Sequence, residues 1–259
     1  MNIIAVIPAR MGSSRFPGKP LAKILGMPMI GHCYKRAEMS ELIDYVYVAT
    51  CDQEIYDYIS EIDGNVVMTS PLHERACDRA AEAMLKIEEI HNIKADILLM
   101  MQGDEPMVTP QIIESALKPL INNKDEKISN LYKEINSVKE FEDPNEVKVI
   151  IDKNGYAIYF SREPIPSRKK GVLNVPMYKQ ICTIPFRRNY LLEFNSMKQT
   201  DLEIIESIDM NRIIENGGKI KMEYSKDESI SVDTLSDLNR VIMEMKDDAI
   251  LNKTRYNKI

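Results

Sequence analysis

Short hydrophobic runs alternate along the first half of the chain with longer segments in which hydrophobic residues recur at helical spacing. The short runs predict strands at residues 3–7, 45–49, 65–68, 97–101, 147–151 and 156–160. The longer segments predict helices at residues 28–39, 53–62, 76–90 and 110–120. Strands that alternate with helices of this length indicate an α/β fold, a mainly parallel mixed sheet flanked by helices.

Polar and charged residues follow several of the predicted strands. In open α/β sheets, ligands bind beyond the carboxyl ends of the strands. We therefore expect residues 10–19, 51–52 and 102–105 to share one rim of the sheet. Asp52 precedes a predicted helix, and a role as its N-cap is a sufficient explanation for an acid there.

The middle of the chain is more polar. Residues 123–143 are rich in charge and predict a solvated connection, and Asn154-Gly155 predicts a hairpin turn between the last two strands. Neither an internal repeat nor a low-complexity linker divides the sequence, so one domain over residues 1–259 is expected.

Composition narrows the class of protein. With 44% hydrophobic and 29% charged residues, the chain is typical of a soluble globular protein, and its net charge of -6 argues against nucleic-acid binding. The four cysteines lie far apart, which indicates neither a zinc site nor a disulfide framework. Met1-Asn2 leads straight into a strand and no apolar run is long enough to cross a bilayer. We expect a cytoplasmic protein without a membrane partner.

The loop after the first strand carries three cations, Arg10, Arg15 and Lys19, among small residues, glycines and prolines. Backbone amides and cations together suit a polyphosphate. The loop is not a P-loop, because five residues separate Gly12 from Gly18 and a proline follows Lys19; the dinucleotide G-x-G-x-x-G pattern is absent too. An ordinary surface turn is the alternative. Three cations directly after the first strand favour the polyphosphate.

From Ile7 to Leu21 the sequence reads I-P-A-R-x-x-S-x-R-x-P-G-K-P-L. This run closely resembles the opening of the bacterial CMP-Kdo synthetases, the 3-deoxy-manno-octulosonate cytidylyltransferases. The resemblance implies a Rossmann-like nucleotidyltransferase fold in which this loop holds the triphosphate of CTP. It further implies that Lys19 and Arg10 are catalytic and that Ser13 and Arg15 bind substrate.

Two acidic motifs extend the resemblance. Gln102-Gly103-Asp104-Glu105-Pro106 follows a buried strand, where an acid is well placed to meet a metal–phosphate complex, although a simple turn is the alternative. Q-G-D-E-P is similar to a hallmark of the family, which implies that Asp104 binds Mg²⁺ and that Gln102 contacts substrate. Residues 231–238 are similar to the family's G-V-D-T-x-x-D-L, which implies that Asp233 is the second Mg²⁺ carboxylate. Asp237 is more simply a first-turn acid of the last helix.

Family members read H-x-S-G-T-[ED]-R in a loop that cradles cytosine mainly through its backbone. At the matching segment this chain keeps the histidine, the acid and the arginine, as His73, Asp78 and Arg79. The residues at this segment that the resemblance assigns to the substrate are Arg75, Ala76, Cys77 and Asp78. The loss of glycine alters the conformations open to the loop. Placement at a helix N-terminus would explain Asp78 by itself.

The second half departs further from the family. Residues 156–162 match A-L-Y-F-S-R, and Arg162 closes an apolar strand where a cation could meet a sugar carboxylate or simply lie at the surface. Gln180 stands where the family has His, while Cys182 and Ile184 replace Gly and Tyr. Glu206 is kept, and an amide is replaced by Met210. These stretches shape the sugar-acid pocket in the family.

The residues themselves supply cations for a polyphosphate and two separated carboxylates, with no candidate nucleophile. That set fits direct in-line attack by a substrate hydroxyl on phosphorus. By resemblance, the substrates are CTP and a 2-keto-3-deoxy sugar acid, the products are a CMP-sugar and pyrophosphate, and the cofactor is Mg²⁺. The resemblance also implies a homodimer and a smaller sugar-binding and dimerisation lobe within residues 155–222.

Two alternatives stay open at this point. The departures in the sugar stretches favour a relative that activates another acidic sugar, such as a nonulosonic acid. A non-catalytic nucleotide-binding relative is the other possibility. Retention of both Asp104 and Asp233 argues against it, because a protein that only binds nucleotide need not keep a metal site.

Overall fold

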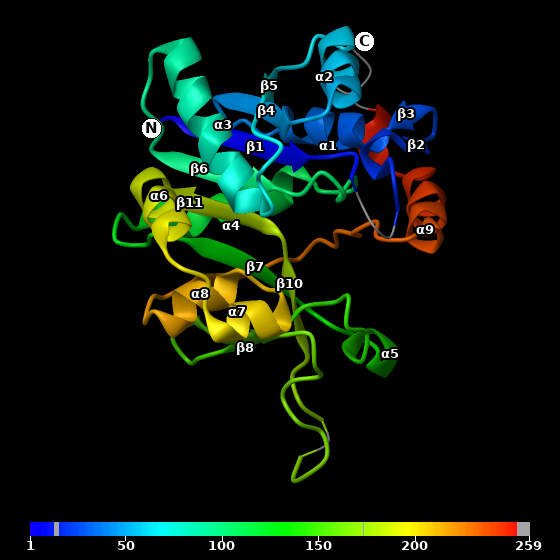
Figure 1. Cartoon of the computed structure of the whole chain (residues 1–259). Coiled ribbons are helices and arrows are strands. Elements are labelled where there is room, and N and C mark those ends of the chain that lie inside the picture. Colours follow the sequence, from blue (N-terminus) through cyan, green and yellow to red (C-terminus); the bar gives the residue numbers. More distant parts are fainter. Residues whose placement is uncertain (13–15, 173, 253–259) are drawn as a thin grey trace. The chain divides into compact units, whose positions relative to one another are not determined.

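The computed structural model of the chain describes residues 1–12, 16–172 and 174–252 (Figure 1). The chain divides into two compact units. The first combines residues 1–114 with the C-terminal segment from residue 227, and the second comprises residues 115–226. The lobe expected within residues 155–222 falls inside the second unit. Its roles in sugar binding and dimerisation stay predictions.

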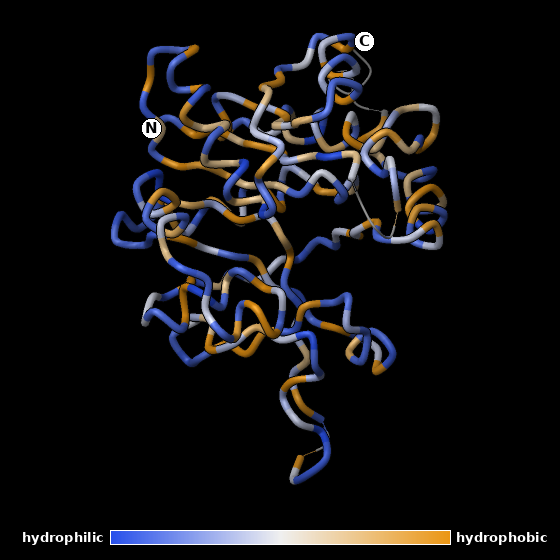
Figure 2. The backbone as a smooth tube through the Cα atoms, viewed as in Figure 1, coloured by the Kyte–Doolittle hydropathy of each residue, from blue (hydrophilic) through white to orange (hydrophobic). Residues whose placement is uncertain are grey.

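The first unit contains a parallel sheet, and its strands confirm the α/β fold. Their spatial order is β6 (Ile97–Met101), β1 (Ile3–Ala9), β4 (Tyr45–Thr50) and β5 (Val66–Met68). Each neighbouring pair is parallel. Every residue of β6 and all but one of β1 are buried, which is why both sequences read as continuous hydrophobic runs. In Figure 2 the hydrophobic stretches follow these strands.

Helices connect these strands close to their predicted positions. They are α1 (Met29–Ala37), α2 (Gln53–Glu61) and α3 (Ala76–His91). The short elements η1 (Lys19–Leu21), β2 (Lys23–Ile24) and β3 (Met27–Pro28) precede α1, and α9 (Leu235–Met245) and η2 (Ala249–Asn252) end the described chain. Helix α3 packs on β1, β4, β5 and β6. The predicted core stripe of α1, Met29, Cys33 and Ala37, is fully buried.

The strand order locates the site. From β1 the chain moves outward to β4 and β5, and then crosses back to β6 on the other side of β1 (Figure 1). Such a reversal leaves a crevice at the carboxyl ends of the two strands that flank it, where doubly wound sheets bind ligands. Here the flanking strands are β1 and β6, and the loops that follow them begin at Arg10 and Gln102.

The second unit has a sheet of its own. Its order is β12 (Lys221–Tyr224), β7 (Ser129–Glu134), β10 (Tyr178–Ile181), β8 (Lys148–Ile151) and β9 (Ala157–Ser161). The β12–β7 pair is parallel and the other pairs are antiparallel. Gly155, at φ +78°, lies in the predicted turn between β8 and β9 and confirms the hairpin.

The helix predicted at residues 110–120 is present as α4 (Pro110–Asn122). The other elements between residues 123 and 226 are α5 (Val138–Phe141), β11 (Thr183–Arg187), α6 (Arg188–Ser196), α7 (Asp201–Glu206) and α8 (Met210–Glu215).

The prediction of a solvated connection over residues 123–143 was wrong. Strand β7 lies inside the second sheet, and its residues Ser129, Asn130 and Leu131 are completely buried. The Ser129 hydroxyl donates to the Ala116 carbonyl at 2.7 Å, so its polarity is satisfied in the interior. Ser129 misled the prediction because its partner lies in α4, 13 residues earlier in the chain.

The helices in the described ranges are all too short or too polar to cross a lipid bilayer.

Candidate active site

Lys19, Asp104 and Asp233 come together in the first unit although they are far apart in sequence. The Lys19 ammonium nitrogen lies 2.5 Å from Asp104 Oδ2 and 3.4 Å from Asp233 Oδ1. Lys19 follows Gly18, whose left-handed φ of +72° favours glycine. The Gly18 amide donates to the Met11 carbonyl at 3.1 Å and closes the loop that precedes Lys19. The structure therefore gathers three of the residues that the sequence singled out.

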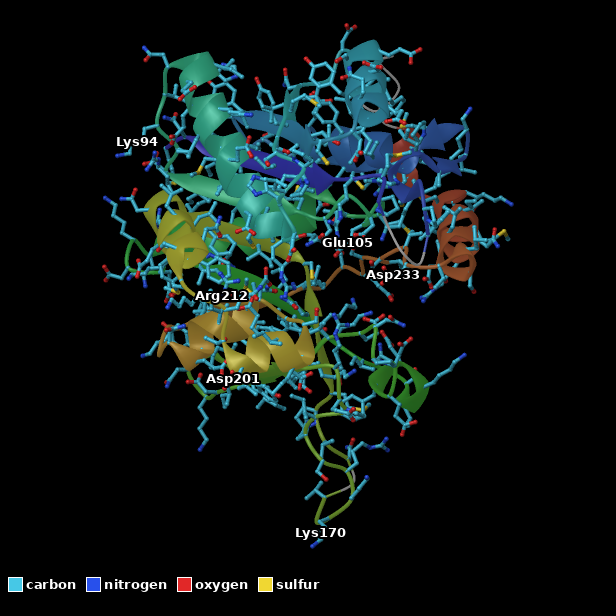
Figure 3. All side chains as sticks on the ribbon, viewed as in Figure 1. Lys94, Glu105, Lys170, Asp201, Arg212 and Asp233 are labelled. Carbon is cyan, nitrogen blue, oxygen red and sulfur yellow. The ribbon has the colours of Figure 1, made fainter. Side chains whose placement is uncertain are left out.

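Local packing fixes the two carboxylates. Asp104 follows Gly103, where a Cβ atom would lie only 3.0 Å from the Pro8 carbonyl oxygen, so the backbone of this turn can approach β1 closely. The Val232 amide donates to the Asp104 carbonyl at 2.9 Å, which joins the segment that carries Asp233 to the turn after β6. Figure 3 labels Glu105 and Asp233 on these two neighbouring segments. The buried Glu105 carboxylate accepts from the Ser229 hydroxyl at 2.8 Å.

The cluster of Lys19, Asp104 and Asp233 is partly open to solvent. Their side chains are 12%, 24% and 21% exposed. The two carboxylates supply oxygen ligands, which Mg²⁺ prefers. This ion is commonly held by one or two carboxylates together with substrate phosphates. Among the described residues no group of three or more His, Cys, Asp or Glu side chains could hold a metal. Two carboxylates are a ligand set that fits a metal arriving with nucleotide phosphates.

Asp237 differs from Asp233. It forms a capping box with Thr234 at the start of α9 and also accepts from the Asp233 amide at 3.1 Å. Its expected role as a first-turn acid is confirmed.

Two other candidates, Arg10 and Gln102, lie at the same rim. Arg10 directly follows β1 and is exposed, and Gln102 directly follows β6 and is half-buried. Because β1 and β6 are parallel neighbours, both side chains start at the same edge of the sheet. Ser13 and Arg15 lie outside the described residues. The catalytic and binding roles of all four stay predictions.

The segment predicted to cradle the base forms the N-terminal turn of α3. Arg75 occupies the N-cap position, Ala76 begins the helix and Asp78 lies in its first turn. Cys77 is buried, with its sulfur 3.6 Å from that of Met100. The Cys77 side chain therefore packs in the interior. The contacts of this segment with substrate stay predictions.

Sequence reasoning missed Glu82, which organises the loop before α3. Its carboxylate accepts from the Ser70 amide at 3.0 Å, from the His73 ring and from Lys86, whose nitrogen lies 2.7 Å away. Partial burial raises the pKa of Glu82, but the hydrogen bonds from Lys86, Ser70 and His73 outweigh it and lower the pKa to about 2. The sequence signal was the Glu-Lys pair at i,i+4, which is also typical of an ordinary surface helix.

The interpretation of Asp52 as a helix cap was wrong. Asp52 stands at the N-cap position of α2, yet within the described residues its side chain bonds to no amide of that helix. Its Oδ2 atom instead accepts from the Met11 amide at 2.7 Å. The carboxylate therefore supports the loop that carries Lys19 rather than α2.

In the second unit, hydrogen bonds join Arg162, directly after β9, to Glu206, at the end of α7. Arg162 donates from Nε to the Glu206 carbonyl at 2.8 Å and from Nη1 to the Pro144 carbonyl at 2.9 Å. The Glu206 carboxylate accepts from Tyr159, Ser161 and the Arg162 amide. Burial raises the pKa of Glu206, and these hydrogen bonds outweigh it and lower the pKa. The pair fixes the end of β9, and its contact with a sugar stays a prediction.

Several other side chains of the second unit have structural partners in its interior. Arg212 donates to both carboxylate oxygens of the buried Glu203, at 2.7 and 2.5 Å, and Figure 3 labels Arg212 there. Met210 is completely buried, so the interpretation of its side chain as part of a sugar pocket was wrong. The Asn211 amide pairs with the backbone of Phe160, at 3.0 and 3.2 Å, and satisfies the β9 backbone. Gln180 is half-buried on β10, and its substrate contact stays a prediction.

A parallel sheet with a strand reversal, and a lysine between two carboxylates at that reversal, fit a nucleotidyltransferase. The same fold is found in 4-diphosphocytidyl-2C-methyl-D-erythritol synthase of Anaerococcus prevotii, with a TM-score of 0.63 at 15% identity over 95% of this chain and 96% of that one. This chain belongs to the Cytidylyltransferase family, whose pattern matches residues 4–226.

Relatives within the family are similar over nearly their whole length. The 3-deoxy-manno-octulosonate cytidylyltransferase of Trichlorobacter lovleyi is 39% identical over 95% of this chain and 99% of its own. That of Thermodesulfovibrio yellowstonii is 42% identical over 92% and 96%. The structure of a CMP:2-keto-3-deoxy-manno-octonic acid synthetase complexed with CTP matches with a TM-score of 0.86 at 33% identity, over 95% of this chain and 99% of that one.

Proposed function

We propose that the protein activates 3-deoxy-manno-octulosonate with CTP, giving the CMP-sugar and pyrophosphate. The observation that carries the proposal is the convergence of Lys19, Asp104 and Asp233 beside the strand reversal. The similarity to 3-deoxy-manno-octulosonate cytidylyltransferases over nearly the whole chain supports the choice of both substrates.

The reaction is a direct phosphoryl-group substitution. The anomeric hydroxyl of the sugar attacks the α-phosphorus of CTP, a new P–O bond forms, and the bond to the bridging oxygen of the β-phosphate breaks. The hydroxyl proton leaves to solvent and pyrophosphate departs. Catalysis of this kind rests on positioning and charge neutralisation. Lys19 and Arg10, with Arg15, would supply the positive charge for the triphosphate and the departing pyrophosphate.

Asp104 and Asp233 would hold Mg²⁺. When bound, the ion neutralises phosphate charge and orients the reacting groups. Binding of the metal with the triphosphate would release the Lys19 ammonium from the carboxylates, so that it can turn to a phosphate oxygen. A homodimer, which the resemblance implies, and a cytoplasmic location, which the sequence pattern favours, are further parts of the proposal.

Another acidic sugar is a second candidate substrate. Gln180, Cys182 and Ile184 stand where the resembling family carries His, Gly and Tyr. A pocket that hydrogen-bonds a sugar discriminates strongly, because an unmatched polar group is left unpaired. We therefore expect that this protein differs from the resembling family in the sugar acid that it prefers, and that it uses CTP and Mg²⁺ as the family does.

Pyrophosphate release from CTP, measured with 3-deoxy-manno-octulosonate and a panel of related sugar acids, tests both candidates. The main proposal requires 3-deoxy-manno-octulosonate to have the highest kcat/KM. A higher value for a nonulosonic acid would transfer the assignment to that sugar, and no release with any acid would overturn both.

The metal assignment has its own variant. Asp104→Asn should fold normally but lose about a thousandfold in kcat, because about 4 kcal/mol of charge stabilisation is removed. Asp57→Asn on α2, whose exposed carboxylate accepts from Gln53, is the control and should keep wild-type turnover. Turnover of Asp104→Asn within a factor of a few of wild type would contradict the assignment.

A further inference from the structure

Asp52 places a carboxylate at the rim where a triphosphate is expected, which is unfavourable unless the group has another task. Its Oδ2 atom accepts from the Met11 amide at 2.7 Å, and its own amide donates to the Thr50 hydroxyl at 3.1 Å. Met11 and Asp52 are 41 residues apart in sequence, so this contact is made by the fold and not by the local turn.

The bond acts on the loop at its base. The Met11 carbonyl accepts from the Gly18 amide at 3.1 Å and thereby closes the loop ahead of Lys19. Both polar groups of Met11 are thus held, one by Asp52 and one by Gly18. The carboxylate therefore fixes the peptide plane from which the cationic loop starts.

The segment after β4 also supports the loop before α3. The Thr50 carbonyl accepts from the Thr69 amide at 2.8 Å and from the Thr69 hydroxyl at 3.1 Å. The Arg79 guanidinium donates in turn to the Thr69 hydroxyl. Residues 50–52 consequently connect the loop proposed for the triphosphate with the segment proposed for the base.

We infer that Asp52 is a positioning residue, which acts through the Met11 amide to hold Met11 in its contact with Gly18 and so to place Lys19 for the triphosphate. The inference rests on the proposed function for the identity of the ligand. It assigns Asp52 no contact with substrate or metal. What it requires from the side chain is an oxygen that can accept a hydrogen bond, and the negative charge is secondary.

Three variants test this role. Asp52→Ala removes the acceptor, Asp52→Asn keeps an oxygen acceptor without the charge, and Asp57→Ala on the same helix removes an exposed carboxylate that faces Gln53. Hydrogen exchange of the Met11 and Gly18 amides is measured on the nucleotide-free protein. Loss of one hydrogen bond should accelerate exchange at these amides about tenfold in Asp52→Ala. Asp52→Asn and Asp57→Ala should stay close to wild type.

Steady-state kinetics supply the functional readout. Asp52→Ala should lower kcat/KM for CTP by about ten- to a hundredfold, mainly through KM, and leave KM for the sugar acid unchanged. Asp52→Asn should recover most of this loss. Equal impairment of Asp52→Asn and Asp52→Ala would overturn the inference, because the charge would then be essential. Wild-type exchange at Met11 in Asp52→Ala would overturn it as well.

The exchange measurement separates this inference from the proposed function. It needs no substrate, so protection of the Met11 amide by Asp52 is decided even if the wild-type protein releases no pyrophosphate from CTP. If Asp52→Ala does not fold, the comparison of Asp52→Asn with wild type still decides between an acceptor and a charge.

Discussion

The Lys19 ammonium group contacts both acids of the candidate site. Lys19 lies between Asp104 and Asp233 at hydrogen-bonding distance from the first and ion-pairing distance from the second. A divalent cation without nucleotide would have to compete with a positive charge that is already present. At an effective dielectric constant of about 20, two unit charges 4 Å apart interact with about 4 kcal/mol. Lys19 should therefore oppose metal binding until a triphosphate arrives.

Removal of this charge should strengthen metal binding. Lys19→Met is expected to bind Mn²⁺ about ten- to a hundredfold more tightly than wild type when no nucleotide is present, while its turnover falls strongly. Titration of free Mn²⁺ by electron paramagnetic resonance measures the affinity. Lys23→Met, a change of an exposed lysine four residues away, is the matched control. Equal or weaker Mn²⁺ binding by Lys19→Met would show that the lysine does not compete for the site.

At the scale of elements, the junction between β5 and α3 depends on one helix residue. Glu82 lies one turn and a half inside α3 and gathers the Ser70 amide, the His73 ring and the Lys86 ammonium. It thereby ties the loop before α3 to the helix itself. The stability of this connection should depend on whether Glu82 is ionised.

Glu82→Gln should destabilise the protein more at pH 7 than at pH 3. The folded-state pKa of about 2 lies below the ordinary value of 4.5, so the carboxylate stabilises the fold above about pH 4.5 and loses that effect as the pH falls towards 2. With the side chain 26% exposed, solvent screening leaves about 1–2 kcal/mol. Urea unfolding at pH 7 and pH 3 measures the difference. Glu89→Gln, an exposed acid on α3, is the control, and a pH-independent loss in Glu82→Gln would contradict the role of ionisation.

The sequence predicted elements whose pattern is local. The buried runs of β1 and β6 and the amphipathic α1 and α3 appeared near their observed bounds, and the parallel pairing placed Arg10 and Gln102 at one edge as expected. The sequence pattern could not predict β7, because a polar residue such as Ser129 indicates solvent exposure unless its hydrogen-bond partner, the Ala116 carbonyl, is known.

The role of Asp52 was missed for the same physical reason. A local cap explained an acid before a helix, whereas its partner lies 41 residues away. Lys19, Asp104 and Asp233 were singled out because two loops followed buried strands and because the motifs resembled a family. Their mutual distances follow from tertiary structure, which the sequence pattern does not contain.

At the scale of the whole molecule, the first unit is built from both ends of the chain. Its C-terminal segment brings Asp233 to the site and packs Val232, Val241 and Met245 against Ile24 and Met29. An ion pair between the completely buried Arg36 and Asp248 fastens the end of this segment to α1. The carboxylate pair of the site therefore exists only while the C-terminal segment stays docked.

His32 lies in α1 next to this ion pair, and it should make the fold sensitive to acid. Its side chain is 2% exposed, and one ring nitrogen lies 2.8 Å from the Ile24 carbonyl oxygen, to which it donates. Burial, aided by the charge of Arg36, lowers the pKa of His32 from 6.5 to about 4. Between these two values the unfolded chain binds a proton that the folded protein does not, so stability falls as the pH decreases from 6.5 towards 4.

The expected loss over that interval is about 3 kcal/mol, since each unit of pKa shift corresponds to about 1.4 kcal/mol. His32→Gln removes the titration and should flatten the dependence of unfolding free energy on pH between 6.5 and 4, although the variant itself is less stable at pH 7. Denaturant unfolding at half-unit pH steps gives both slopes. His91→Gln, a change of a half-buried histidine at the end of α3, is the control. If His32→Gln keeps the wild-type slope, other groups cause the acid sensitivity and the docking of the C-terminal segment is independent of His32.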